Sequence, residues 1–226
     1  MEFLLDTIHL ADIERYTKCL PIAGVTSNPT IVKKEGKIDF FPHMRKIRQL
    51  IGPKATLHVQ VVGQTPEAML ADAHTILKNI DESVYIKVPT TELGLQVIKQ
   101  LKAEGHHVTA TAIYTKFQGY LAIAAGADYI APYYNRMENM NLDAATAVAE
   151  FAKLIQQNNA NTKILAASFH NIGQVNTAFE NGAQAATMGV DIIQAALQMP
   201  AIDQAVKAFT SDWESIYGPQ QTIHDL

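Results

Sequence analysis

Short apolar runs alternate with longer amphipathic segments along the whole chain. Between most of the runs, apolar residues recur three and four positions apart, as in PEAMLADAHTILKNI (66–80), and this spacing predicts a helix with one buried face. The runs themselves predict strands, which start roughly 20 to 35 residues apart, the length of one strand–helix repeat. The expected strands are 3–7, 24–28, 57–61, 84–89, 108–112, 129–133, 163–168 and 185–188.

Eight such repeats predict a single (β/α)8 TIM barrel that covers residues 1–226. The rival is an open doubly wound sheet, but no GxGxxG follows the first expected strand, which weakens its nucleotide-binding version. Residues 201–218 predict one further amphipathic helix with more apolar residues than a surface helix needs. We expect this helix to pack on the barrel or, as the preferred interpretation, on a neighbouring subunit.

Net charge, apolar runs and cysteine content limit the kinds of molecule and compartment that we expect for this protein. Lys and Arg number 18 against 22 Asp and Glu, a net charge of −4, so we expect no nucleic-acid partner. The first ten residues carry no basic segment, and the longest apolar run is far shorter than the roughly 18 residues of a membrane span. Cys19 is the only cysteine, which excludes an intrachain disulfide and a cysteine zinc site. These features predict a cytoplasmic protein without a membrane partner.

Side-chain alternation predicts which residues face the inside of the barrel. If Val84, Ile86 and Val88 face the helices, then Lys87 points inward. In strand 108–112 the rule turns Ala112 outward. In strand 163–168 it turns Leu165 and Ala167 outward, and Ile164, Ala166 and Ser168 inward. Applied to every strand, it predicts an inward polar set made of Asp6, Thr26, Asn28, Gln60, Lys87, Thr111, Tyr133 and Ser168.

These polar residues lie near the carboxyl ends of their strands, where barrel active sites lie. A purely structural barrel interior consists mainly of Val, Ile and Leu. An unpaired buried polar group costs about 1–3 kcal/mol, so these residues need partners or a ligand. The pattern therefore predicts a site that contains Lys87.

Lys87 allows two interpretations. It could form a structural ion pair with Asp6, since buried lysines are usually paired. It could instead be a nucleophile: burial lowers an amine pKa from about 10.4, and a neutral amine attacks a ketone to form an imine. Gln60, Thr111 and Tyr133, together with Asp6, could move protons and hold a polyhydroxy chain. This inventory suits cleavage of a sugar without a cofactor.

The histidines do not predict a metal site. No HExxH motif or other recognisable ligand spacing occurs in the chain. His106 and His107 are adjacent, and adjacent residues face opposite sides of a strand. We therefore expect no metal ligand among them.

Seven short motifs resemble one known family. Together they resemble the transaldolase family, and within its small (type 3) subfamily the fructose-6-phosphate aldolase branch. The motifs occur in family order and span nearly the whole chain. They are LDT (5–7), GVTSNPT (24–30), HVQ (58–60), IKVP (86–89), TATAIY (109–114), APYYNR (131–136) and LAASF (165–169).

The resemblance implies a class I mechanism, in which Lys87 forms a Schiff base with the substrate. It implies that Asp6 helps proton transfer and orients substrate hydroxyls. Thr26 and Asn28 match residues that hold the dihydroxyacetone part of the substrate. The family works in pentameric rings, often paired as decamers, so the resemblance also implies a homo-oligomer.

For the phosphate of the substrate, the resemblance implies binding by Arg136 and Ser168. A planar guanidinium suits a phosphate group. The aldolase branch can carry Lys immediately after Phe169, where this chain has His170. Family aldolases can also carry an apolar aromatic residue at the position of His58, which here could alter carbinolamine breakdown or pack.

Two activities within the family share the first half of the reaction. We expect an aldolase that cleaves fructose 6-phosphate to dihydroxyacetone and glyceraldehyde 3-phosphate and catalyses the reverse addition. The alternative is a transaldolase of the pentose phosphate pathway, which passes the dihydroxyacetone unit to an aldose phosphate. Family transaldolases usually carry Glu at the position of Gln60 and often Phe at that of Tyr133. Gln cannot titrate, so it can position a water but cannot act as the acid or base.

Two interpretations from other classes remain. A barrel that only binds a sugar phosphate would use Lys87 as an ion-pair partner and would keep its function after Lys87→Met. A metal-dependent lyase or isomerase would lose activity with a chelator.

Overall fold

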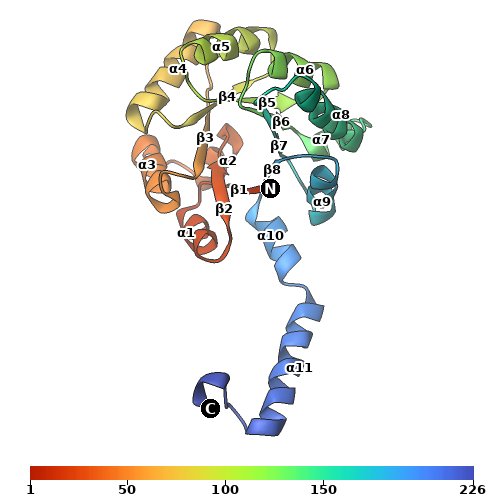
Figure 1. Ribbon diagram of the computed structural model, residues 1–226. Coiled ribbons are helices and arrows are strands. Elements are labelled where there is room, and N and C mark those ends of the chain that lie inside the picture. Colours follow the sequence, from red (N-terminus) through yellow and green to blue (C-terminus); the bar gives the residue numbers. More distant parts are fainter.

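The computed structural model describes residues 1–226, and its eight parallel strands close into a barrel (Figure 1). The strands pair in chain order, and β8 returns to β1. The predicted (β/α)8 barrel is therefore confirmed. The strands are β1 (Glu2–Asp6), β2 (Ile22–Thr26), β3 (Thr56–Gln60), β4 (Tyr85–Pro89), β5 (Val108–Ile113), β6 (Tyr129–Pro132), β7 (Lys163–Ala166) and β8 (Ala185–Met188).

Helices surround the barrel and connect successive strands (Figure 1). They are α1 (Leu10–Cys19), α2 (Pro29–Glu35), α3 (Phe40–Ile51), α4 (Pro66–Asn79), α5 (Glu92–Ala103), α6 (Lys116–Ala124), α7 (Tyr134–Asn139), α8 (Ala144–Gln157), α9 (Ile172–Glu180), α10 (Val190–Leu197), α11 (Pro200–Tyr217) and a short 3-10 helix, Ile223–Asp225.

Several helices begin directly after a strand because a polar side chain caps them. Asn28, Thr65, Thr91, Thr115 and Asn171 each accept a hydrogen bond from the backbone N–H three residues further on. Such caps satisfy donors that the first helical turn leaves unpaired. The loops at the carboxyl ends of the strands are therefore held in place, and these loops carry the polar residues of the predicted site.

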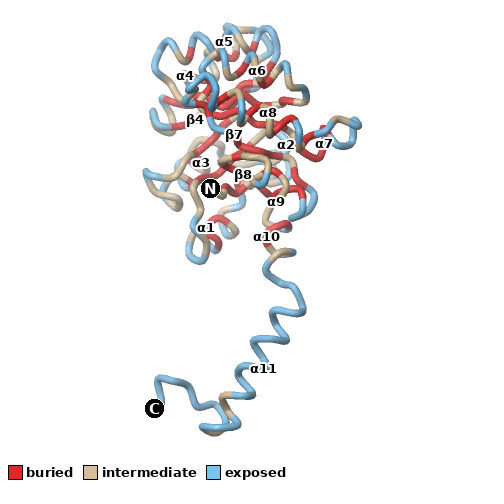
Figure 2. Tube along the Cα trace, turned by 45° about the vertical axis from the view of Figure 1, so that its right-hand side comes forward, coloured by how far each residue is buried: buried red, intermediate tan, exposed pale blue.

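Two layers of apolar residues fill the molecule. The larger layer lies between strands and helices and includes Val25, Ile86 and Ile130. A small cluster of Leu4, Tyr129, Leu165 and Ala185 fills the inside of the barrel. Figure 2 shows the buried residues concentrated in the barrel, while α11 is exposed over most of its length.

Strand β7 has the opposite orientation from the one predicted. Leu165 belongs to the cluster inside the barrel, whereas Ile164 and Ala166 pack in the layer against the helices. The sequence KILAAS has apolar residues on both faces of the strand, so alternation carries no contrast there. Ser168 still faces the carboxyl-terminal opening of the barrel. It follows the strand with φ +62°, and this backbone conformation breaks the alternation that would have turned it outward.

The prediction that Ala112 faces the helices is also wrong. Ala112 has φ +57°, and the pairing of β5 with β6 shifts register between Ala110 and Ile113. Ala112 therefore turns toward the inside of the barrel, and Ile113 takes the place against the helices. Such a bulge re-aims the residues at the end of a strand.

The C-terminal helix α11 agrees with the predicted 201–218 within one residue at each end. It contains no buried residue and extends away from the barrel (Figure 1). None of the helices has both the length and the apolar character needed to cross a membrane.

Candidate active site

A pocket of about 330 Å³ lies at the carboxyl ends of the strands. It brings together seven of the nine residues expected from the sequence: Asp6, Asn28, Gln60, Lys87, Tyr133, Arg136 and Ser168. The other two, Thr26 and Thr111, lie behind the pocket wall and donate hydrogen bonds to pocket residues.

Lys87 comes from β4 and is 5% exposed. Its ammonium donates a hydrogen bond to the backbone carbonyl of Ser27 at 2.8 Å. The ion pairs of the structure do not include Lys87, so it does not form the structural pair with Asp6. Burial lowers the pKa of Lys87, and the negative charge of Asp6 opposes this effect. Loss of the proton therefore needs less alkaline conditions than for a free lysine.

Asp6 ends β1 and lies opposite Thr26 on β2. Its carboxylate accepts a hydrogen bond of 2.6 Å from the Thr26 hydroxyl. The Thr26 oxygen also lies 2.6 Å from the hydroxyl oxygen of Thr187 on β8. Thr26 is fully buried, so it orients the carboxylate from behind the pocket.

Tyr133 provides a phenol on the side of the pocket formed by β5 and β6. The Thr111 hydroxyl donates a hydrogen bond to the Tyr133 oxygen at 3.1 Å. Burial raises the pKa of Tyr133, although the Thr111 hydrogen bond opposes the rise. The phenol therefore keeps its proton at neutral pH and can donate it to a substrate atom.

Gln60 ends β3 on the pocket wall. Its side-chain oxygen is buried and has no hydrogen-bond partner. A buried acceptor without a partner is costly and calls for an explanation. Because Gln60 lines the pocket, a ligand hydroxyl or a bound water is the natural donor for this oxygen.

Arg136 lies on α7 at the mouth of the pocket. Its Nη1 donates a hydrogen bond of 3.0 Å to the Tyr114 hydroxyl, and its guanidinium lies 4.9 Å from the centre of the Tyr133 ring. Two aromatic side chains thus fix the orientation of this cation. The sequence did not indicate this role for Tyr114, although it lies within the TATAIY motif.

A buried amide connects the loops that carry Arg136 and Ser168. Gln174 donates a hydrogen bond to the Asn135 side-chain oxygen at 2.9 Å and accepts one from the backbone N–H of His170 at 2.7 Å. The backbone N–H of Asn135 donates to the Ser168 carbonyl at 3.0 Å. The start of α7 and the loop after β7 therefore form one rigid edge of the pocket.

His58 lies inside the barrel and not among the residues that line the pocket. Its two ring nitrogens lie 2.8 Å from the hydroxyls of Thr109 and Thr56, and its ring stacks on Tyr85 at 4.8 Å. Burial holds the pKa of His58 well below its usual value. It is therefore a neutral packing residue whose polar atoms are satisfied.

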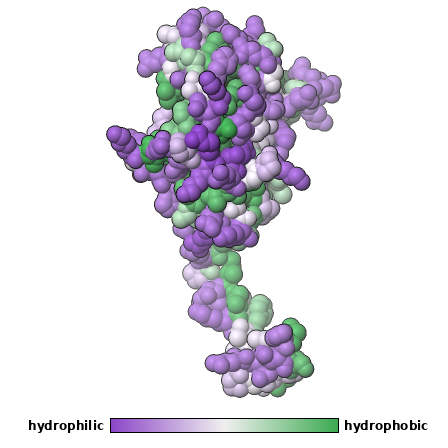
Figure 3. All heavy atoms as spheres, turned by 90° about the vertical axis from the view of Figure 1, so that its left-hand side faces the viewer, coloured by the Kyte–Doolittle hydropathy of each residue, from purple (hydrophilic) through white to green (hydrophobic).

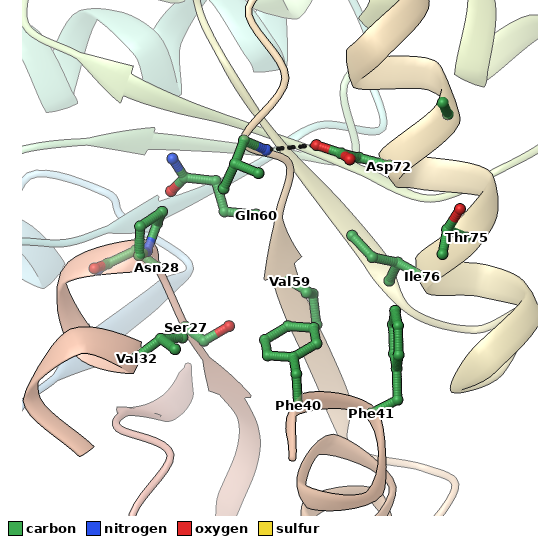
Figure 4. Close-up of a pocket in the computed structure, with 13 residues that line it drawn as sticks. Ser27, Asn28, Val32, Phe40, Phe41, Val59, Gln60, Asp72, Thr75 and Ile76 are labelled. Atoms are coloured by element: carbon green, nitrogen blue, oxygen red, sulfur yellow. Dashed lines mark hydrogen bonds between the residues drawn. The ribbon is translucent and has the colours of Figure 1, made fainter. Parts of the chain in front are cut away.

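A second cavity of about 440 Å³ adjoins the pocket between α2, α3 and α4. It shares Asn28, Pro29 and Gln60 with the first, and Figure 4 shows the amides of Asn28 and Gln60 beside each other. The rest of its wall is largely apolar and includes Phe40 and Phe41, whose rings are 5.3 Å apart. Asn28 and Gln60 therefore separate a polar pocket from an apolar one.

The fold and the pocket place the chain among the (β/α)8 barrel proteins whose site lies at the carboxyl ends of the strands. Comparison with known proteins identifies the family. A family model described as "Transaldolase/Fructose-6-phosphate aldolase" matches residues 3–220, so the chain belongs to this family, and the resemblance seen in the sequence is confirmed.

One relative is similar over nearly the whole chain. It is a protein of Streptococcus pneumoniae (strain ATCC 700669 / Spain 23F-1) named "Probable fructose-6-phosphate aldolase". The two are 53% identical over 213 residues, which make up 94% of this chain and 96% of that protein.

Proposed function

We propose that this protein is a class I aldolase that cleaves fructose 6-phosphate into dihydroxyacetone and glyceraldehyde 3-phosphate and catalyses the reverse addition. The observation that carries the proposal is a buried lysine, Lys87, without a carboxylate partner, in one pocket with the cation Arg136. The name of the similar S. pneumoniae protein supports the aldolase branch over the transaldolase branch.

Lys87 is the nucleophile of the proposed reaction. Its neutral amine attacks the C2 ketone, and loss of water gives a protonated imine. A base then removes the proton of the C4 hydroxyl, the C3–C4 bond breaks, and its electrons flow into the imine. This releases glyceraldehyde 3-phosphate and leaves an enamine on Lys87. Protonation at C3 and hydrolysis of the imine then release dihydroxyacetone.

Asp6 and Tyr133 are the proposed proton-transfer groups. They line the pocket with Lys87, and each has one hydroxyl partner that fixes its position. The carboxylate can accept the proton of the C4 hydroxyl, and the phenol can protonate the carbinolamine oxygen. Thr26 and Thr111 act through these two groups. This differs for Thr26 from the direct substrate contact that the family resemblance implied.

Asn28, Arg136 and Ser168 are the proposed substrate-binding residues. The Asn28 side-chain oxygen caps α2 at 3.0 Å from the Ile31 nitrogen, so its NH₂ group is left to donate to the hydroxyls of the dihydroxyacetone part. Arg136 and Ser168 both line the pocket, and the backbone hydrogen bond from Asn135 to Ser168 holds their loops together. There the guanidinium fits the phosphate of the substrate.

Gln60 is the proposed binding site for the water that hydrolyses the imine. Its unpartnered oxygen can accept a hydrogen bond from a water molecule without exchanging a proton. A water held there could attack the imine carbon and free dihydroxyacetone. In a transaldolase, by contrast, the enamine carbon adds to an aldose phosphate before water hydrolyses the imine.

The deciding experiment measures glyceraldehyde 3-phosphate release from fructose 6-phosphate, with and without erythrose 4-phosphate. Sustained release without the acceptor is expected for the aldolase. Release that depends on the acceptor would show a transaldolase and would contradict the preference for an aldolase that Gln60 and Tyr133 support. No release under either condition would reject both activities.

Borohydride trapping tests the nucleophile. Reduction in the presence of fructose 6-phosphate or dihydroxyacetone should add one covalent substrate fragment to Lys87, which mass spectrometry can locate. Lys87→Met should abolish both the adduct and the cleavage. Retained activity in this variant would support a protein that uses Lys87 only for binding or structure.

We also propose that α11 packs against a neighbouring copy in a homo-oligomer. Apolar side chains recur alternately four and three residues apart along this helix, at Ile202, Val206, Phe209, Trp213 and Ile216. Figure 3 shows apolar atoms gathered along α11, beyond the largely polar surface of the barrel. Phe209 and Ile216 are 70% and 74% exposed. A stripe of this kind is typical of a helix that buries one face against a partner.

A further inference from the structure

Three potential metal ligands meet on the outside of the barrel, at the end opposite the catalytic pocket. His74 belongs to α4, Glu104 follows the last turn of α5, and His106 precedes the start of β5. One carboxylate oxygen of Glu104, Oε2, lies 2.8 Å from His74 Nε2 and 3.7 Å from His106 Nε2. The three donor atoms all lie within 4.8 Å of one another.

We propose that His74, Glu104 and His106 bind a divalent transition-metal ion of the zinc type. Two imidazoles and one carboxylate form a donor set that suits Zn²⁺. Ligands about 2.1 Å from a tetrahedral zinc lie about 3.4 Å from one another. The distances of 2.8 Å and 3.7 Å fall on either side of this value, and no pair of donor atoms is more than 4.8 Å apart, so side-chain rotations can bring the three ligands to this geometry.

The backbone turn between α5 and β5 brings two of the ligands to the same place. Gly105 has φ +87°, a conformation that side chains other than glycine rarely adopt. The backbone N–H of His106 donates to the carbonyl of Leu101 at 2.9 Å. This turn folds the chain back over the end of α5, and His106 thereby approaches Glu104, two residues before it.

One neighbour of the cluster orients a ligand, and a second brings a negative charge close to it. Gln100 donates a hydrogen bond to Oε1 of Glu104 at 3.0 Å, which leaves Oε2 directed at the histidines. Glu82 Oε2 lies 3.9 Å from Nδ1 of His106, the ring nitrogen that does not face the proposed ion. At this distance the carboxylate makes no hydrogen bond to His106, but its negative charge favours a cation at the cluster.

The cluster is accessible to an ion in solution. The side chains of His74, Glu104 and His106 are 50%, 31% and 22% exposed. An ion held by three protein ligands would therefore have its fourth position open to water. Sequence spacing did not predict this site, because His74 is 30 residues from Glu104 and the fold alone brings them together.

Zinc titration of the tag-free protein, stripped with a chelator, tests the proposal. Isothermal titration calorimetry should show one Zn²⁺ per chain for the wild type. His74→Ala and His106→Ala should each lower the affinity by at least about tenfold. Substitution with Co²⁺ should give visible absorption bands that are lost in the same variants.

His9→Ala is the matched control. His9 is an exposed histidine that also pairs with a glutamate, at 3.1 Å from Glu35, but no third ligand joins that pair. This variant should bind Zn²⁺ as the wild type does. Equal affinities of the wild type, His74→Ala and His106→Ala would overturn the proposal, and so would the absence of binding to the wild type.

Folding of the variants is checked independently. Circular dichroism and cleavage of fructose 6-phosphate should be unchanged in His74→Ala, because the cluster is remote from the pocket. If His74→Ala fails to fold, His74→Gln, which can still donate a hydrogen bond to Glu104, takes its place with the same expected loss of affinity.

Discussion

Burial of Lys87 couples the charge of one residue to the stability of the whole barrel. Its pKa is lowered by burial from the value of about 10.4 that an unfolded chain shows. Between the lowered pKa and about 10.4, the unfolded state binds one more proton, so the free energy of unfolding rises with pH. Below the lowered pKa, the folded state carries the full cost of the buried charge.

Lys87→Met should therefore be more stable than the wild type near neutral pH. Met keeps the length and the apolar contacts of the side chain and removes the charge. Each full unit by which the pKa is lowered corresponds to about 1.4 kcal/mol. Urea unfolding of both proteins at about pH 6.5 and at about pH 10.4, the pKa of a free lysine, measures the difference, which should shrink at the higher pH. A difference independent of pH would contradict the burial of a charged Lys87.

Two tyrosines of the pocket should have separable kinetic effects. Their rings are 5.5 Å apart, but Tyr133 is the proposed proton donor, whereas Tyr114 holds Arg136. Tyr133→Phe should lower kcat by about 10²-fold or more. Tyr114→Phe should raise KM for fructose 6-phosphate about two- to tenfold, the effect of one lost hydrogen bond, and keep kcat.

The control for the tyrosine pair uses an acceptor without phosphate. In the synthesis direction, Tyr114→Phe should leave the reaction of dihydroxyacetone with glyceraldehyde unchanged, while Tyr133→Phe should impair it. If Tyr114→Phe affects both aldehydes equally, its role lies in general packing and not in phosphate binding.

At the residue scale, side-chain alternation was sufficient to turn Lys87 and Gln60 inward, because the residues beside them are strongly apolar. It could not reveal the hydrogen bond from Lys87 to the carbonyl of Ser27. Every residue has a backbone carbonyl, so the sequence does not indicate which carbonyl a side chain will meet. The unpartnered oxygen of Gln60 also depends on the three-dimensional surroundings.

At the scale of the strand, the sequence failed where both faces of a strand are apolar and where the backbone departs from regular alternation. In β7, Ile164 and Leu165 are both apolar, so the two possible orientations look alike in the sequence. In β5, the positive φ of Ala112 reverses the alternation after Thr111. Neither position carries a glycine that would have indicated an unusual backbone.

The effect of substitutions at Ala112 on the free energy of unfolding tests the bulge in β5. A β-branched residue is strained at positive φ, so Ala112→Val should destabilise the protein by about 1–3 kcal/mol. Ala112→Gly should be close to neutral, because glycine adopts this φ freely but loses more entropy on folding. Urea unfolding of the two variants measures the contrast. Equal stabilities would show that β5 changes its backbone when Val is introduced.

At the scale of the molecule, the repeat of strands and helices was enough to predict a closed barrel with one additional helix. Each repeat has its own apolar pattern, and parallel strands joined by helices have few ways to close. The cluster of His74, Glu104 and His106 could not be predicted from the sequence, because its members come from different strand–helix repeats. Its position depends on how α4 packs beside α5.

The exposed helix α11 leads to a prediction for the whole assembly. The wild-type protein should be a homo-oligomer by size-exclusion chromatography with light scattering. Phe209→Lys places a charge in the apolar stripe and should shift the mass toward the monomer, because a charge in such a contact is costly to bury. Thr210→Lys, at the next position, which is also exposed, should leave the mass unchanged.

Circular dichroism separates the loss of assembly from the loss of folding in this test. Since α11 contributes no buried residue to its own barrel, Phe209→Lys should keep the circular dichroism spectrum of the wild type even when it dissociates. A monomeric wild type would contradict the proposed role of α11. An oligomer that survives Phe209→Lys would place the contact between copies on another surface, because the proposed contact through α11 cannot bury an unpaired lysine without loss of affinity.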